Sequence, residues 1–513
     1  MGHAELFLHM FIRKNKNRSG TISIQIVHKY NRSNKVIKTV GIAKTKREEE
    51  LLLLLAKTEL ERLSGLQSLF VEHDDLVVEN FVNSIANEHL QIIGTELILG
   101  KIYNKIGFPS DGSCDYFKNL VLSRLVYPGS KLKTVDYFRR HLNMNTSVYS
   151  IYRFLDELNT ELKPTIEQIA FEYSKSLLGG KIGVVFYDMT TLYIEASQED
   201  DYRIAGFNKD GKHQQPQIMI GLLVSGPGNP IGYQIFEGNT SESNTLIPVL
   251  EQFQSKFGIN KPIIVADAAL LSQKNIKALV KKGYEYILGG RLKNEAEEIK
   301  EKVLGLEVEE NKPGEFLTKN GRLIISFSSK RAFIDKRNRE RGLKRLEKKV
   351  SGGKLNKVHI NNRGYNKYLK LIGEASIVID YEKYNADAIW DGLKGYVTNT
   401  ELKSNLVIEH YTKLWNIEKA FRISKTDLRI RPIYHRLKNR IEAHICICFV
   451  AYSVYKELER LLNLNNIRLS PEKAIKEIKE ILQLQYILPK SKLVKTKILN
   501  PTKAQIQLLE MKI

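Results

Sequence analysis

The chain has 513 residues, enough for several domains, and 42% of them are hydrophobic, which excludes global disorder. Lys and Arg total 80 against 58 Asp and Glu, a formal net charge of +22. This excess of positive charge indicates an anionic partner, most often nucleic acid and sometimes a membrane surface. No apolar run approaches the roughly 20 residues of a spanning helix, so we expect no membrane association. Three cysteines are too few for a disulfide framework, which favours a reducing, intracellular compartment.

The first 180 residues combine a short strand region with helical patterns. Residues 20–42 alternate apolar and polar around the break N-R-S-N-K, which predicts a β-hairpin. Residues 48–63 carry a leucine stripe, and Pro128-Gly129-Ser130 precedes a basic helix over 131–141. We therefore expect an N-terminal β-hairpin at 1–45 and a helical domain at 46–180. That helical domain is a candidate for recognising DNA ends, although a purely structural bundle explains it equally well.

From residue 181 the pattern becomes α/β. Apolar runs at 182–187, 217–225, 230–236, 262–266 and 284–288 predict buried strands, with helices at 240–257 and 273–282. This succession predicts a mixed sheet covered by helices. Residues 402–425 and 441–462 have the pattern of two long helices. We divide this part into a core at 181–289, a β-rich insertion with one basic helix at 290–395, a second core part at 396–465 and a basic helical tail at 466–513.

Three acidic residues stand in apolar surroundings. Asp188 follows V-V-F-Y, Asp267 follows P-I-I-V-A, and Glu418 lies within a helical pattern. Ligands gather at the carboxyl ends of strands in open sheets, so the two aspartates would meet there and the glutamate would join them. Three carboxylates make an oxygen-rich site for Mg²⁺ or Mn²⁺, and two such ions stabilise both oxygens of a phosphoryl displacement. Taken singly, such an aspartate is more often a turn former or helix cap, and such a glutamate is more often on a solvated helix face; their combination in one basic chain is what favours a site.

The helix around Glu418 also carries basic residues. At about 3.6 residues per turn, Tyr411, Glu418, Arg422 and Lys425 share one stripe. A carboxylate with basic groups within two turns suits a phosphodiester, because the carboxylate holds a metal while the cations hold flanking phosphates. Ordinary pairing of Glu418 with Arg422 is the alternative explanation. The basic stretch 330–349 similarly predicts either a DNA contact or a solvated helix.

These residues resemble the DDE transposases of bacterial insertion sequences, in the subgroup with a Y-x2-R-x3-E-x6-K signature. Tyr411, Glu418 and Lys425 stand at the required spacings, and Leu414 stands where the signature has arginine. The surrounding W-N-I-E-K-A-F-R, the R-P-I-Y-H that begins at Arg431 and the strand block V-V-F-Y-D-M-T-T are also similar to that subgroup. The resemblance extends from about residue 110 to 455.

The resemblance implies a ribonuclease-H-like catalytic core, a mixed sheet with helices on both faces, interrupted by the insertion before the glutamate. It implies a transposase that cuts phosphodiester bonds at transposon ends and joins the freed 3′-hydroxyl to target DNA by metal-dependent transesterification. Asp188, Asp267 and Glu418 would be the catalytic ligands of two Mg²⁺ or Mn²⁺ ions. The DNA-binding residues would be Tyr411 and Lys425, near the cleaved phosphate, together with Arg422 and Arg431.

The implied partners are double-stranded DNA, both transposon ends and target, and a second copy of the chain in a homodimer on paired ends. The implied location is the bacterial cytoplasm, in association with the nucleoid. An alternative is a sequence-specific DNA-binding protein derived from a transposase without cleavage activity, although all three carboxylates are present. A phosphohydrolase is disfavoured, because its nucleophile loop needs a second aspartate where Thr190 stands.

Overall fold

The computed structural model describes residues 10–30, 33–64, 73–110, 112, 114–196, 198–206, 214–258, 261–270, 272–353, 355–362, 364–372, 376–488 and 491–513. The chain forms two compact units, Met1–Leu90 with Gln485–Thr496, and Gln91–Leu484 with Lys497–Ile513. Within the described ranges, none of the helices carries the long apolar stretch that a bilayer crossing requires.

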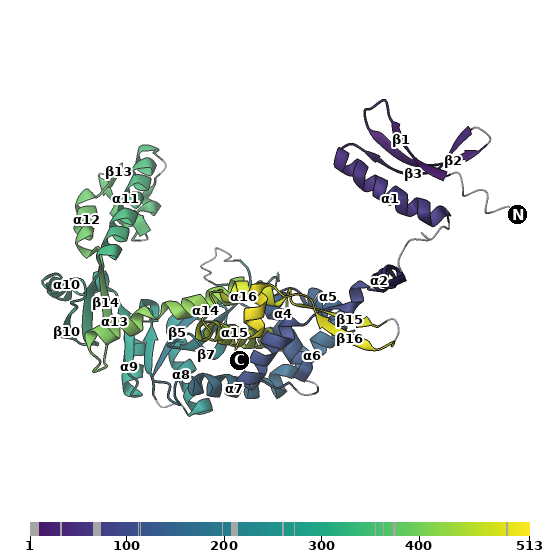
Figure 1. Ribbon diagram of the computed structural model, residues 1–513. Coiled ribbons are helices and arrows are strands. Elements are labelled where there is room, and N and C mark those ends of the chain that lie inside the picture. The colour runs from purple at the N-terminus through teal and green to yellow at the C-terminus, as the bar shows by residue number, and fades with distance from the viewer. Residues whose placement is uncertain are drawn as a thin grey trace. The chain divides into compact units, whose positions relative to one another are not determined.

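The first unit contains an antiparallel sheet of β1 (Met10–Lys16), β2 (Ile22–Tyr30) and β3 (Ser33–Ala43), in that order. The predicted hairpin is β2 with β3, paired from Ile22 and Ala43, and β1 adds a strand that the pattern did not predict. Two residues of the predicted break, Asn31 and Arg32, lie outside the described residues. The helix α1 (Lys46–Ser64) packs on this sheet and is followed by α2 (His73–Asn83) (Figure 1).

The second unit is built on an eight-stranded sheet in the order β10-β11-β14-β9-β8-β5-β6-β7. The strand β5 runs parallel to β8 and antiparallel to β6, so the sheet is mixed, as predicted. The strands are β5 (Val184–Tyr193), β6 (Gln217–Ser225), β7 (Pro230–Glu237), β8 (Ile263–Ala266), β9 (Tyr286–Gly290), β10 (Gly314–Thr318), β11 (Gly321–Phe327) and β14 (Leu393–Thr398). Three further strands are β4 (Leu90–Ile92), β15 (Leu482–Ile487) and β16 (Val494–Ile498).

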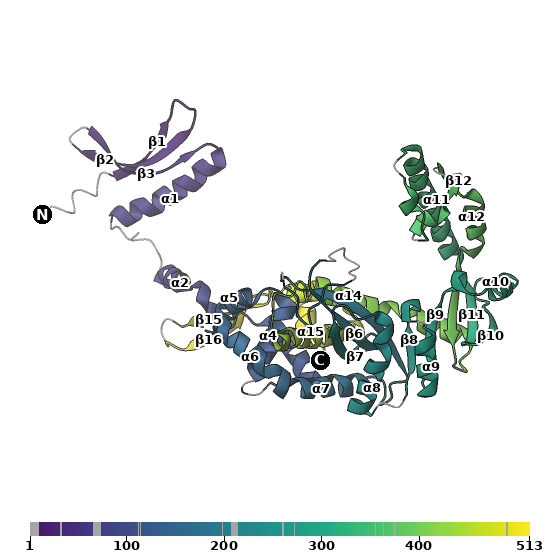
Figure 2. The same ribbon diagram turned by 180° about the vertical axis from the view of Figure 1, so that it is seen from behind.

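Helices cover both faces of this sheet, since its strands are apolar on both sides (Figures 1 and 2). The helices that pack on the sheet or on other helices of this unit are α3 (Lys101–Ile106), α4 (Cys114–Val126), α5 (Lys131–His141), α6 (Val148–Glu161), α7 (Lys163–Ser176), α8 (Leu246–Phe257), α9 (Gln273–Lys281), α10 (Glu297–Leu304), α13 (Ser404–Thr412), α14 (Trp415–Thr426), α15 (Lys438–Leu464), α16 (Pro471–Ile478) and α17 (Lys503–Leu509). The helices α8, α9 and α10 pack on one face, and α13, α14 and α15 pack on the other.

The predicted insertion is not separate from this sheet. Its strands β10, β11 and β14 continue the sheet beyond β9, with Gly290 of β9 opposite Gly395 of β14. The remaining elements of the insertion are the basic helix α11 (Ser329–Ser351), the paired strands β12 (Leu369–Ile372) and β13 (Ser376–Ile379), and the short helix α12 (Tyr381–Ala386). They form a small core of their own around Leu346 and Tyr368.

Two of our sequence predictions about the site elements were wrong. Asp188 does not follow a strand but lies in the middle of β5, which continues to Tyr193. The strand continues because β-branched Thr190 and Thr191 favour extended backbone. They lie between Met189 and Leu192, whose buried side chains pack on either side of the sheet.

The predicted single helix over 402–425 is two helices, α13 and α14. At the break, Leu414 N–H donates to the carbonyl of Tyr411 at 3.0 Å, and Ile417 N–H donates to that of Leu414 at 3.1 Å. Such i→i+3 bonds form a tight turn in place of continuous α-helix. The hydrophobic period runs through this turn without interruption, so the pattern does not reveal it.

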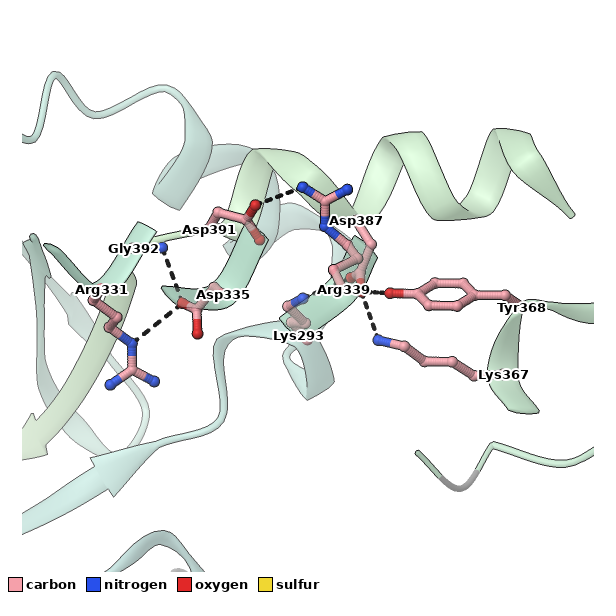
Figure 3. Close-up of polar contacts among 9 residues, drawn as sticks. All are labelled: Lys293, Arg331, Asp335, Arg339, Lys367, Tyr368, Asp387, Asp391 and Gly392. Carbon is pink, nitrogen blue, oxygen red and sulfur yellow. Dashed lines mark hydrogen bonds and ion pairs between the residues drawn. The ribbon is translucent and has the colours of Figure 1, made fainter. Parts of the chain in front are cut away.

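A network of ion pairs fixes the insertion to the end of the sheet (Figure 3). Asp387 accepts from Lys293 Nζ at 2.6 Å and from Lys367 Nζ and the Tyr368 hydroxyl at 2.5 Å each. Arg339 of α11 donates to Asp391 at 2.6 Å. Burial by itself would raise the pKa of Asp387, but the three donors outweigh it and hold that pKa well below its usual value.

We expect Asp387→Asn to loosen the insertion by about 2 kcal/mol, because it removes a charged acceptor of three hydrogen bonds. The measurement is hydrogen exchange of the β12 and β13 amides. A depressed carboxyl pKa stabilises the folded state above about pH 4 and loses that contribution as the pH falls further, so wild type and variant converge in acid. Glu382→Gln, which makes the same charge change on exposed α12, is the control. Equal exchange in the two variants would contradict this role.

Candidate active site

The two predicted aspartates lie on the same face of adjacent strands. Side chains alternate along β5, so that Val185 and Tyr187 face α8, while Phe186 and Leu192 face the side of α13 and α14. Asp188 is on the latter side by the same alternation. In β8, Val265 faces that side too, and Asp267 follows it by two residues.

The register brings these aspartates together. Tyr187 of β5 pairs with Ala266 of β8, so the next positions along the two parallel strands are Asp188 and Asp267. Neighbouring strands are about 4.8 Å apart, which makes the two carboxylates neighbours. Each has an oxygen at a nearby amide: Asp188 Oδ1 accepts from Met189 N–H at 2.7 Å, and Asp267 Oδ1 accepts from Ala269 N–H at 2.8 Å.

Glu418 joins Asp188 from the covering helix. The two side chains line one cavity of about 640 Å³, together with Phe421 and Lys425 of α14 and Glu242 from the loop after β7. The helix α14 presents this side because Ile417, Ala420 and Ile423 are buried against the sheet. The side chains of Asp188, Glu418 and Lys425 therefore line one cavity, and Ala269, two residues after Asp267, lies in its wall.

Tyr411 and Lys394 connect Glu418 with Asp267. Burial raises the pKa of the Tyr411 hydroxyl, and the negative charges of Asp267 and Glu418 raise it further. Lys394 of β14 places Nζ 4.4 Å from the centre of the Tyr411 ring. Burial lowers the pKa of Lys394, and the charge of Arg331 lowers it further, while Glu418 opposes the shift. Asp267, Glu418 and Arg331 are thus close enough to affect the pKa of this buried phenol, and Lys394 contacts its ring.

Lys394 and Arg331 are site residues that sequence reasoning missed. Both line a second cavity of about 370 Å³ with Tyr411, Ala268 and Gly289. Both come from the predicted insertion, where nothing in the local sequence distinguishes them from other lysines and arginines. The ion pair of Arg331 with Asp335, at 3.5 Å, and the Asp335 bond to Gly392 N–H, at 3.1 Å, help to position Arg331 (Figure 3).

Arg422 and Arg431 lie elsewhere. Arg422 is exposed and is not among the residues that line the carboxylate cavity. At about 100° per residue, it projects roughly 40° to one side of Glu418, whereas Phe421 and Lys425 project to the other. Arg431 lies over the Tyr193 ring, at 5.6 Å from its centre, beside a different cavity. Leu414, at the arginine position of the signature, is a core residue with 7% exposure.

The donor chemistry of the three carboxylates suits a divalent ion. Hard oxygen ligands are those that Mg²⁺ and Mn²⁺ prefer. Over the described residues, however, the structure contains no group of three or more His, Cys, Asp or Glu side chains already placed to hold a metal. Each of the two aspartates is hydrogen-bonded through one carboxylate oxygen to the amide named above.

A family model described as transposase DDE domain matches residues 179–454, more than half of the chain. The chain therefore belongs to the family of transposases with a DDE domain, which carry out DNA transposition. The matched segment runs from just before β5 to α15 and includes Asp188, Asp267 and Glu418.

No curated protein matches the chain. Among solved structures, the chain is similar to the piggyBac transposase in a synaptic complex with hairpin DNA, at 9% identity and a TM-score of 0.39, covering 80% of each chain. It is also similar to the Mos1 mariner paired-end complex with Mn, at 14% identity and a TM-score of 0.15, covering 48% of this chain and 78% of that one.

The site depends on close packing at Gly289, the β9 position beside Asp267. A Cβ there would meet the Tyr411 hydroxyl and would lie 3.1 Å from the Ala268 amide nitrogen. We expect Gly289→Ala to lower the free energy of unfolding by about 1–3 kcal/mol, as overpacking does. Tyr411→Phe removes the nearest atom, so in that background the same substitution should cost less. Urea unfolding measures both effects.

Gly183→Ala is the matched control, because nothing lies within 4 Å of the added Cβ. Equal losses at positions 183 and 289 would contradict the close contact.

Proposed function

We propose that this chain is a transposase of the Y-x2-R-x3-E-x6-K subgroup that cuts transposon ends and joins the freed 3′-hydroxyl to target DNA. The observation that carries the proposal is the β5–β8 register, which makes Asp188 and Asp267 neighbours on the face that α14 covers with Glu418. The order of β7, β6, β5, β8 and β9, in which β6 runs antiparallel to the other four strands, supports a ribonuclease-H-like core.

In this proposal the three carboxylates would hold two Mg²⁺ or Mn²⁺ ions. Bound divalent ions would supply the charge that activates water and stabilises the leaving 3′-oxygen. The carboxylates would position the scissile phosphate through the ions that they hold. Asp188 and Glu418 border a cavity of about 640 Å³, which leaves room for that phosphate.

Basic residues around the carboxylates would hold the DNA strand. Lys425 lines the carboxylate cavity one helical turn beyond Phe421, where a phosphate beside the scissile bond would lie. Lys394 and Arg331 extend positive charge along the second cavity on the other side of Tyr411. A strand crossing both cavities would meet a cation on each side of the cut. The working unit would be a homodimer that holds two ends.

The test uses DNA that carries the terminal repeats flanking the gene. With Mg²⁺, we expect Asp188→Asn, Asp267→Asn and Glu418→Gln to lower the cleavage rate by roughly 100-fold or more, since each removes a ligand of ions worth several kcal/mol. The three variants should still bind the ends in gel-shift assays. These substitutions preserve side-chain shape, so unfolding is not expected.

Two carboxylates serve as controls. Glu242→Gln changes an acid that lines the same cavity, and Glu409→Gln changes an exposed acid of α13 that pairs with Lys413 at 2.7 Å. Both should keep cleavage. If Glu242→Gln abolished cutting and Glu418→Gln did not, the ligand assignment would be wrong. If the wild-type protein bound the ends but failed to cut them whichever divalent ion was supplied, the chain would be a DNA-binding protein derived from a transposase.

A further inference from the structure

A basic cavity apart from the carboxylates has no acidic residue among those that line it. Its volume is about 420 Å³, and we call it the anion cavity. It lies between α4, the start of α5, α15 and the loop from Arg429 to His435. Its charged and titratable lining residues are Arg124, Lys131, Lys133, Arg429, Arg431, His435 and His444.

Two cations of the anion cavity are buried without an acidic partner. Arg124 is 5% exposed and Lys131 is 6% exposed. In the part of the chain that the structure describes, neither side chain forms an ion pair or a hydrogen bond. Nearby Arg440, by contrast, is paired with Asp156 through bonds of 2.8 and 2.7 Å. Removing a charge from water without giving it a partner costs free energy. Retaining Arg124 and Lys131 at these positions therefore lowers the stability of the folded chain.

Other donors converge on the same cavity. Ser130 caps α5 by accepting from Lys133 N–H, and the amides of Lys131 and Leu132, at the first helical positions, have no acceptor within the helix. A helix of this length carries partial positive charge at such an end. His444 is 5% exposed; its Nε2 lies 3.0 Å from the Ile430 carbonyl oxygen, and its Nδ1 has no partner among the described atoms.

The anion cavity is attached to the strand that carries Asp188. Arg431 lies over the ring of Tyr193, the last residue of β5, and Ile433 N–H donates to the Tyr193 carbonyl at 3.2 Å. Five residues separate Asp188 from Tyr193, which corresponds to about 17 Å along an extended strand. Since one DNA strand advances about 3.4 Å per nucleotide, this distance spans roughly five nucleotides.

We propose that the anion cavity binds one backbone phosphate of the DNA, about five nucleotides from the cleaved phosphate. This proposal rests on the proposed function, because it assumes that the cut occurs at Asp188. Arg124, Lys131 and the α5 amides supply the donors, and the phosphate supplies the negative charge that the cavity lacks. Arg431 binds the same phosphate from the loop, so its part in DNA binding is separate from the carboxylates.

The first test measures binding of end DNA without divalent ions, so that no cleavage is needed. Lys131→Met and Arg124→Met should each weaken binding about tenfold and reduce the slope of log K against log salt by about 0.9. The double variant should lose little more than either single one, because both cations hold the same phosphate. Unchanged slopes, or losses that add in full, would overturn the proposal.

The same variants separate binding from folding. A methionine removes the buried charge while keeping a long apolar side chain, so each variant should melt at a higher temperature than the wild type while binding DNA less well. A purely structural role predicts lower melting temperatures. Lys274→Met, an exposed charge of α9 on the opposite face of the sheet, is the control and should change neither property.

A pH profile gives a second reading. Burial and the charge of Arg124 lower the pKa of Lys131 to about 7 in the free protein, with a small opposing effect from Cys448. The other charged or titratable groups that line the cavity are Lys133, Tyr152, Arg429, Arg431, Tyr434, His435 and His444. Lys131 is charged below pH 7 and loses that charge as the pH rises, so DNA affinity should fall between pH 6 and about 8.5. Lys131→Arg keeps its charge and should remove this fall; persistence of the fall would count against the proposal.

The last arm distinguishes backbone phosphate from free phosphate. A neutral methylphosphonate linkage is moved one position at a time along each strand of the end. Near the fifth nucleotide from the cut it should weaken wild-type binding and have no effect on Lys131→Met. If no position distinguishes the two proteins while inorganic phosphate raises the melting temperature of the wild type only, the cavity binds free phosphate and the DNA proposal is wrong. These tests measure binding and melting without divalent ions. A protein that binds the ends but fails to cut them would therefore give the same results, so failure of the proposed function can be told apart from failure of this proposal.

Discussion

The parallel register of β5 and β8 is the constraint on which the site depends. It places Asp188 beside Asp267 on the face of the sheet that the helices α13 and α14 cover. Two carboxylates this close repel each other, so the pair needs cations nearby. Lys394, Arg331 and Lys425 supply positive charge from three separate elements. The aspartate at the end of V-V-F-Y is therefore part of an electrostatic arrangement that only the whole fold completes.

Much of the fold could be predicted from the sequence, because its central strands are continuous apolar runs and its helices have clear periodicity. The predicted strands at 217–225 and 230–236 correspond to β6 and β7, and the family match shows the transposase class that the motif around Glu418 indicated. The middle of β5 was not predictable in the same way, since the charged Asp188 ends the apolar run that marks the start of the strand. The break between α13 and α14 leaves no mark on the hydrophobic period.

The basic residues around the site were harder to predict than the acidic ones. Lys394 and Arg331 reach Tyr411 only because β14 pairs with β9 and α11 begins beside it. Arg124 and Lys131 are separated from Arg431 by about three hundred residues and share a cavity with it only in the folded chain. The net charge of the chain indicates an anionic partner. It does not show which lysine and arginine side chains are paired with carboxylates and which are available to bind an anion.

The pairing of β11 with β14 has an evolutionary consequence. The chain leaves the sheet at Phe327, the last residue of β11, and re-enters it at Leu393, which pairs with Phe327 from β14, so both junctions of the intervening segment lie side by side. A segment with adjacent ends can lengthen, shorten or be exchanged without shifting the register of the strands that carry the carboxylates. The part formed by α11, β12, β13 and α12 is thus free to diversify among related elements, while β11 must stay to cover the edge of β14.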